Sequence, residues 1–190
     1  MNRFCAALSD QSREKLCEAA QRVRLKAKER VAVTAIPDKV AIVGQGAIVA
    51  HVGSVDSDRT MASFIAVSGD VVNIMRVAGA AGVYPEDFNV ADYGYVLKPA
   101  EVCFVPLEVL RKLAQEPDVS AAIIVQLTDR YKDALDSMRR ANYGSAESRV
   151  RWLVEYLELK DIPLISVTHD EMALILGMNR VTVTRMLNQL

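Results

Sequence analysis

The sequence predicts an α+β protein with a strand-rich N-terminal region, one long helix and a C-terminal helix-turn-helix. Three patterns support this: short apolar runs between residues 23 and 105, an apolar repeat between residues 120 and 141, and two capped helices in the last two dozen residues. We place the domain boundaries at 1–116, 117–142 and 143–190.

The N-terminal region alternates short apolar runs with turn residues. The runs cover 31–34, 40–43, 47–52, 62–67 and 95–97, and the breaks fall at 37–38, 44–46 and 68–70. Many short strands with regular turns are typical of a sandwich or a barrel. This region therefore predicts a closed or nearly closed antiparallel sheet.

The long helix begins after Pro117-Asp118 and ends at Tyr143-Gly144. Its apolar positions follow alternating spacings of four and three residues, which is typical of a coiled-coil seam. The seam residues are Ser120, Ile124, Leu127, Tyr131, Ala134, Met138 and Ala141. Those from 124 to 138 are the expected dimer contacts. Ile123 and Leu135 flank the seam and are expected to pack on the sheet. A single helix buried on its own domain would use the same residues.

The helix-turn-helix prediction depends on local capping signals. Thr168 and Glu171 form a capping box that opens a helix, and Gly177 suits the left-handed residue that ends it. Asn179 can then cap a second helix that starts at Arg180. The apolar face of the first helix is Met172, Ala173, Ile175 and Leu176. A preceding helix over 149–157 buries Trp152, Leu153, Tyr156 and Leu157 as its scaffold.

The second helix has a buried face and a face rich in hydrogen-bond donors. Val183, Met186, Leu187 and Leu190 recur at helical spacing and are expected inside. Arginine suits guanine or phosphate, threonine suits phosphate or the thymine methyl, and asparagine suits adenine. The candidate DNA contacts are Thr168, Arg180, Val181, Thr182, Thr184, Arg185 and Asn188. An ordinary helical hairpin with solvated arginines is the alternative.

Residues 177–190 resemble the recognition helix of the Crp/Fnr family of bacterial transcription regulators, whose pattern is G-x-S/T-R-E-T-V-x-R-x-L-x-x-L. The matching residues are Arg180, Thr182, Val183, Arg185, Leu187 and Leu190. The resemblance implies a jelly-roll or β-roll effector domain, often of the cyclic-nucleotide-binding type, a dimerisation helix and a winged-helix-type helix-turn-helix. It also implies a homodimer that binds a palindromic operator in double-stranded DNA, with RNA polymerase and a small-molecule effector as further partners.

Two features depart from the family pattern. Val181 stands where the family has a glutamate that accepts from cytosine, and valine cannot accept a hydrogen bond. The family also continues past the recognition helix into a β-hairpin wing, whereas this sequence ends at Leu190. The familiar operator therefore need not apply, and the wing is missing from the sequence.

The effector that the resemblance implies is not cyclic AMP. Family members that bind it carry G-D-x-x-G-E, but Asn73 and Ile74 replace the last two residues after Gly69-Asp70. Val90 and Ala91 fall where the phosphate-binding arginine and serine are expected, and a buried phosphate without a cationic partner is costly. Ala134 and Leu135 likewise offer no hydrogen bond to a base from the partner subunit. The candidate effector contacts are Asp70, Asn73, Arg76 and Tyr131.

Composition excludes several other classes of protein. The net charge of -1 and pI near 6.1 give no bulk attraction to DNA, so any contact must come from a local patch. The sequence has neither an apolar run of membrane-spanning length nor a signal peptide, so we expect a cytoplasmic protein without a membrane partner. The odd number of cysteines, without C-x-x-C spacing, argues against a disulfide framework or a zinc site.

No cofactor can be named from the sequence. Cys5 and Cys17 are too few for an iron-sulfur cluster, and His51 and His169 are too few for a cupin metal site. His51 could ligate haem, although a lone strand histidine is more often structural. No catalytic grouping is recognisable, so we predict a non-enzyme. The alternative from another class is an effector-sensing or protein-interaction module that has lost DNA binding.

Overall fold

A computed structural model describes residues 2–32, 38–54, 57–79 and 93–190. Two short helices come first, α1 (Arg3–Ala6) and α2 (Asp10–Ala19), capped by the side chains of Asn2 and Ser9. The strands are β1 (Gln21–Leu25), β2 (Arg30–Ala32), β3 (Lys39–Ser54), β4 (Ser57–Val67), β5 (Val71–Val72) and β6 (Tyr93–Pro106). A short helix α3 (Met75–Gly79) follows β5.

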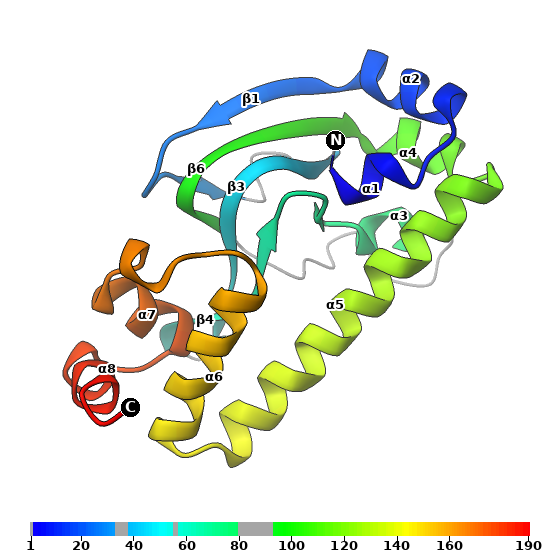
Figure 1. The fold of residues 1–190 in the computed structure, drawn as a ribbon. Helices are drawn as coiled ribbons and strands as arrows, with labels where there is room; N and C mark the ends of the chain where they lie inside the picture. Colours follow the sequence, from blue (N-terminus) through cyan, green and yellow to red (C-terminus); the bar gives the residue numbers. More distant parts are fainter. Residues whose placement is uncertain (1, 33–37, 55–56, 80–92) are drawn as a thin grey trace.

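The described strands form one antiparallel sheet that curves into a roll (Figure 1). Its order is β1-β6-β3-β4, with β2 paired to β6 and β5 paired to β3. The long strands β3 and β6 are central because β3 pairs with β4 on one side and with β6 on the other. The predicted antiparallel β-roll is therefore confirmed.

The predicted break at residues 44–46 is wrong, because β3 runs through it. The pairing of β3 with β6 shifts register on both sides of Gln45, so the glycines mark bulges in a continuous strand. Gly46 has φ 88°, and a Cβ there would overlap the Pro99 carbonyl and Ala100. The break at Ser68-Gly69-Asp70 is confirmed as the turn that separates β4 from β5.

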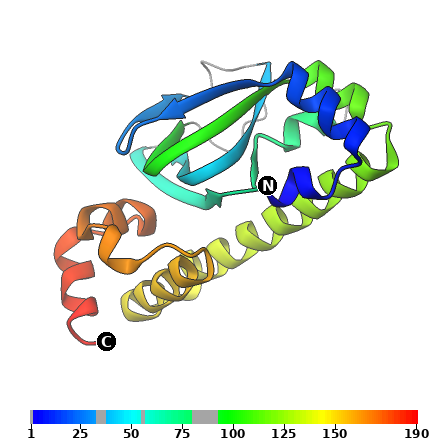
Figure 2. The same ribbon diagram turned by 45° about the horizontal axis from the view of Figure 1, so that its top comes forward.

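Helices continue the chain after β6. They are α4 (Leu107–Leu113), α5 (Pro117–Tyr143), α6 (Ala146–Leu159), α7 (His169–Leu176) and α8 (Arg180–Leu187), with a 3-10 turn at Leu164–Ser166. In Figure 2, α5 extends along the molecule from the end that carries α1 and α2 to the end that carries the C-terminal helices. None of the helices in the described part of the chain is long and apolar enough to span a membrane.

The apolar core has three clusters, and two of them belong to the roll alone. One fills the inside of the sheet around Val43, Val96 and Phe104, and another packs α1, α2, α4 and the start of α5 on it. The third joins Val49, Ile65 and Leu97 of the sheet to the buried residues of α6, α7 and α8. The C-terminal helices are therefore packed directly against the roll.

Candidate functional site

The C-terminal helices form the predicted helix-turn-helix with the predicted caps. The Thr168 hydroxyl accepts from the Glu171 amide at 3.2 Å, and Glu171 Oε2 accepts from the Thr168 amide at 2.8 Å, so both halves of the capping box are present. Gly177 ends α7 in the left-handed conformation at φ 59°. Asn179 Oδ1 then accepts from the amides of Val181 and Thr182 and opens α8.

The face of α8 that was predicted to bind DNA lies on the surface. Arg180, Val181, Arg185 and Asn188 are exposed, and Val181 is 75% exposed. Thr182 and Thr184 are half-buried, and the Thr184 hydroxyl lies 2.8 Å from His169 Nδ1. Arg180, Val181, Thr184, Arg185 and Asn188 line one shallow surface. The structure therefore brings the α8 candidates other than Thr182 together on one face.

Two details of the helix-turn-helix formed by α7 and α8 differ from the sequence prediction. Leu190 is 50% exposed rather than buried, because α8 ends at Leu187 and the chain no longer follows the helical face. Thr168 is exposed, but its hydroxyl also donates to Glu171 Oε2 at 2.9 Å. This side chain is therefore engaged in the helix cap.

Glu171 connects the helix-turn-helix to the roll. Its Oε1 accepts from the hydroxyl of Tyr95 on β6 at 3.0 Å, while its Oε2 completes the capping box. The Glu171 carboxylate is buried. Burial of the Tyr95 hydroxyl, followed by its hydrogen bond to this carboxylate, raises the pKa of Tyr95. One side chain thus both shapes α7 and fixes its position against the sheet. The sequence identifies the cap but gives no sign of the partner on β6.

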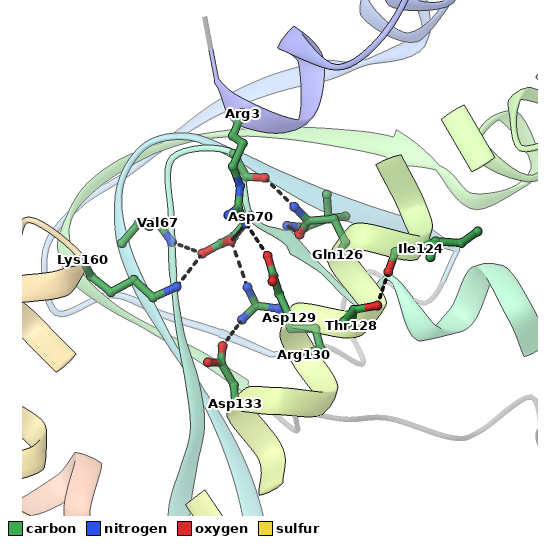
Figure 3. Close-up of polar contacts among 12 residues, drawn as sticks. Arg3, Val67, Asp70, Ile124, Gln126, Thr128, Asp129, Arg130, Asp133 and Lys160 are labelled. Atoms are coloured by element: carbon green, nitrogen blue, oxygen red, sulfur yellow. Dashed lines mark hydrogen bonds and ion pairs between the residues drawn. The ribbon is translucent and has the colours of Figure 1, made fainter. Parts of the chain in front are cut away.

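Asp70 is the centre of a charged cluster at the junction of the two parts (Figure 3). Its carboxylate is 1% exposed and lies 2.9 Å from Arg130 on α5, 3.3 Å from Arg3 and 3.5 Å from Lys160. The Val67 amide also donates to it at 2.9 Å. This arrangement neutralises a carboxylate that would be costly to bury alone. Because Lys160 is the C-cap residue of α6, the cluster joins the roll and α5 to α6, the helix that supports α7 and α8.

Sequence reasoning missed all three cations of this cluster, of which Arg130 is the most buried. It is buried over the ring of Phe64, 4.1 Å from the ring centre, and its Nη1 donates to Asp133 at 3.2 Å. Four residues earlier, the buried Gln126 bonds the backbone of Val71 and Gly69. Two polar side chains one turn apart, on the face that carries Ile123, were the available signal, since buried polar groups need partners.

The predicted effector contacts do not form one site. Asp70 is already surrounded by three cations, and Asn73 is buried in a left-handed turn at φ 64°. The Arg76 carbonyl accepts from Arg111 at 2.9 Å, whereas Tyr131 is 67% exposed on the outer face of α5. Ile74 is buried in the cluster beneath α1 and α4. Val90 and Ala91 lie outside the described residues.

The exposed apolar stripe of α5 differs in part from the predicted seam. Ile124, Tyr131, Ala134 and Met138 are exposed as expected, with Ile124 at 62%. Leu127, however, packs on the core of its own protomer, while Leu135, which was expected on the sheet, is 42% exposed. Ile123 is buried as predicted. The exposed stripe is therefore Ile124, Thr128, Tyr131, Leu135 and Met138, again spaced by four and three residues.

Among the described residues, no group of three or more His, Cys, Asp or Glu side chains could hold a metal ion. His51 lies on β3, fully buried, with its ring stacked on Tyr93 at 4.8 Å between ring centres. Neither ring nitrogen has a hydrogen-bond partner among the residues that the structure describes. Burial, with a contribution from Arg30, lowers the pKa of His51 to about 4, so the ring is neutral at neutral pH.

Comparisons with known proteins identify solved structures that share this fold. No protein-family model matches the chain, and no curated protein matches its sequence. Among solved structures, the chain is similar to a protein from Eubacterium rectale described as a transcriptional regulator of the crp/fnr family. The TM-score is 0.72 at 15% identity over 98% of this chain and 85% of that one.

Two further structures give the same result. One is the c-di-GMP responsive global regulator CLP of Xanthomonas campestris, with a TM-score of 0.73 at 18% identity over 95% of this chain and 91% of that one. The other is FixK2 of Bradyrhizobium japonicum, with a TM-score of 0.68 at 18% identity over 90% and 83%. The chain therefore has the α+β fold of the Crp/Fnr-type regulators over nearly its whole length.

Proposed function

We propose that this protein is a homodimeric, sequence-specific DNA-binding transcription regulator of the Crp/Fnr type. Its parts would be an effector domain over 1–116, a dimerisation helix over 117–142 and a DNA-binding domain over 143–190. The observation that carries the proposal is the exposed face of α8, which presents Arg180, Arg185 and Asn188. The helix itself has no acidic residue, and Arg180 also lies 3.6 Å from Asp170 of α7. Such a helix supplies the donors that phosphates and base edges accept.

The exposed stripe of α5 supports the dimer. Ile124, Tyr131, Leu135 and Met138 would be buried against the same residues of a second copy, since a two-fold interface brings like surfaces together. Two readers related by such an axis bind half-sites about 34 Å apart, which corresponds to a palindromic operator. RNA polymerase is the further partner that a transcription regulator of this kind implies.

The effector is a molecule other than cyclic AMP. Ile74, at the position of the ribose-binding glutamate, is buried in an apolar cluster, and the neighbouring Asp70 is committed to its cluster of cations. A cyclic nucleotide would find no acceptor for its ribose at Ile74.

Binding to duplex DNA tests the proposal. A random duplex pool is selected with the purified protein and sequenced, and the enriched palindrome is then titrated by fluorescence anisotropy. We expect Arg185→Ala to raise the Kd by about tenfold or more, because each good base contact contributes about 1–3 kcal/mol. Binding should also weaken with salt, because phosphate contacts release counterions.

Arg151→Ala is the matched control. Arg151 is an exposed arginine of the same domain that pairs with Glu147 on α6 and lies outside the α8 face, so its loss should leave the Kd unchanged. If a folded wild-type dimer enriches no sequence, or Arg185→Ala binds as tightly as the wild type, the proposed role of α8 is wrong. The first result would favour the protein-interaction module.

A further inference from the structure

A pocket of about 200 Å³ lies where the C-terminal helices α6 and α7 meet the roll and α5. Its walls come from β4, α5, α6 and the end of α7. The roll, the long helix and the C-terminal helices therefore all contribute to the pocket. The apolar wall consists of Phe64, Ile65, Trp152, Leu159, Ile175 and Leu176. The volume is below the roughly 300–1,000 Å³ of sites for drug-sized ligands, so the pocket fits a smaller molecule.

Two of the three acids that line the pocket already have cationic or hydroxyl partners. Asp133 accepts from Arg130 at 3.2 Å and from Tyr156 at 3.3 Å, and Asp136 pairs with Arg140 at 3.4 Å. These two acids are therefore already paired.

The cations of the lining differ in whether they already have partners. Lys132 makes no ion pair or hydrogen bond in the described part of the chain. Arg140 is engaged, because it lies over Trp152, 4.2 Å from the ring centre, and pairs with Asp136. Glu155, exposed on α6, has no partner among the described residues. Lys132 on α5 is therefore the lining cation that can pair with an anionic group in the pocket.

We propose that this junction pocket is the effector site and that it takes a small carboxylate with an apolar, ring-sized body. The carboxylate would pair with Lys132, and the body would pack against the apolar wall at Phe64 and Trp152. This inference rests on the proposed function for its regulatory meaning. A ligand held between α5 and α6 has a different affinity whenever these helices change their relative position, and that difference is what shifts a two-state equilibrium.

The pocket contains its own optical reporter. Trp152 is the single tryptophan of the chain, so its fluorescence reports on this wall alone. The probe is 3-phenylpropionate, and the matched neutral probe is 3-phenylpropionamide, which has the same shape without the charge. We expect a saturable change in Trp152 emission with the acid, and binding of the amide weaker by about tenfold because it lacks the charge-assisted hydrogen bonds.

Three variants locate the site. Lys132→Met should raise the Kd for the acid by roughly three- to fivefold, the size of an exposed ion pair. Arg139→Met is the matched control, because Arg139 is an exposed cation on the same helix that does not line the pocket. Ser137→Phe should fill the pocket and abolish the change. No saturable change, equal affinities for acid and amide, or undisturbed binding by Ser137→Phe would overturn the proposal.

Titration of operator DNA with and without 3-phenylpropionate separates this inference from the proposed function. A change in DNA affinity that Ser137→Phe removes supports both. Ligand binding by a protein that binds no duplex leaves the pocket assignment standing and refutes the regulator. DNA binding by a protein whose Trp152 does not respond to the acid refutes the pocket alone.

Discussion

His51 is a buried titratable side chain with no hydrogen-bond partner in the described part of the chain. Its pKa of about 4 in the folded protein lies below the ordinary value of 6.5, chiefly because burial disfavours the charged ring. As pH falls below 6.5, His51 becomes protonated in the unfolded chain but stays neutral in the folded protein. Stability is therefore lost between pH 6.5 and pH 4, by an amount on the order of 3 kcal/mol.

We expect His51→Phe to be less sensitive to acid than the wild type. Phenylalanine keeps the stacking on Tyr93 and carries no polar atoms that need partners. The free energies of unfolding, measured by urea denaturation from about pH 7 to about pH 4.5, should converge or cross as pH falls. Parallel pH profiles of the two proteins would show that His51 does not carry this dependence.

Residues whose role is set by local geometry were predictable, and residues whose role depends on distant partners were not. Thr168, Gly177 and Asn179 act within a few residues of their own positions, so their sequence spacing specifies them. Asp70 was chosen for its place in a motif, but its role depends on Arg3, Arg130 and Lys160. These three cations come from remote parts of the chain, so no local pattern pairs them with Asp70.

The long strand β3 shows how an element can continue through apparent turn residues. Gly44-Gln45-Gly46 predicts a break, but the backbone bulges there while β3 remains paired with β6. The bulges let one strand follow the curvature of the roll, because a bulge bends the strand and increases its twist. A sequence pattern cannot distinguish a turn from a bulge when both use glycine, because the partner strand lies about fifty residues away.

Two glycine substitutions two residues apart test this description of β3. Gly46→Ala should lower the free energy of unfolding by about 1–3 kcal/mol or more, because the residue has φ 88° and an added Cβ would overlap backbone. Gly44→Ala is the matched control, since its Cβ would lie 3.3 Å from the Glu101 carbonyl oxygen and requires only a small shift. Equal loss of stability in chemical denaturation would contradict the bulge at Gly46.

At the scale of the whole molecule, the stripe on α5 should determine the oligomeric state. The helix and its heptad spacing were predictable, because periodicity is a property of the sequence. The exact face was not, since Leu127 and Leu135 exchange their predicted roles once the roll occupies one side of the helix. Ile124, Tyr131 and Met138 belong to both the predicted and the observed stripe.

Neighbouring residues of α5 provide the test. Ile124→Asp places a charge in the stripe and should convert the dimer to monomers, with a loss of operator affinity because the two half-sites are no longer bound together. Val125→Asp is the matched control, because Val125 is 52% exposed but lies outside the stripe. Sedimentation velocity distinguishes the two species. A dimeric Ile124→Asp, or a monomeric Val125→Asp, would place the interface elsewhere.

The apolar cluster shared by the sheet and the C-terminal helices limits how far this protein can be treated as modular. Val49, Ile65 and Leu97 pack in the same cluster as Leu153, Met172 and Val183, so the core of the C-terminal helices is completed by the sheet. Separating the two parts at residue 144 would expose apolar surface on both. The two parts should therefore unfold in one cooperative transition, and the C-terminal helices could not be exchanged for those of another protein with this fold without redesigning the surface of the roll beneath them.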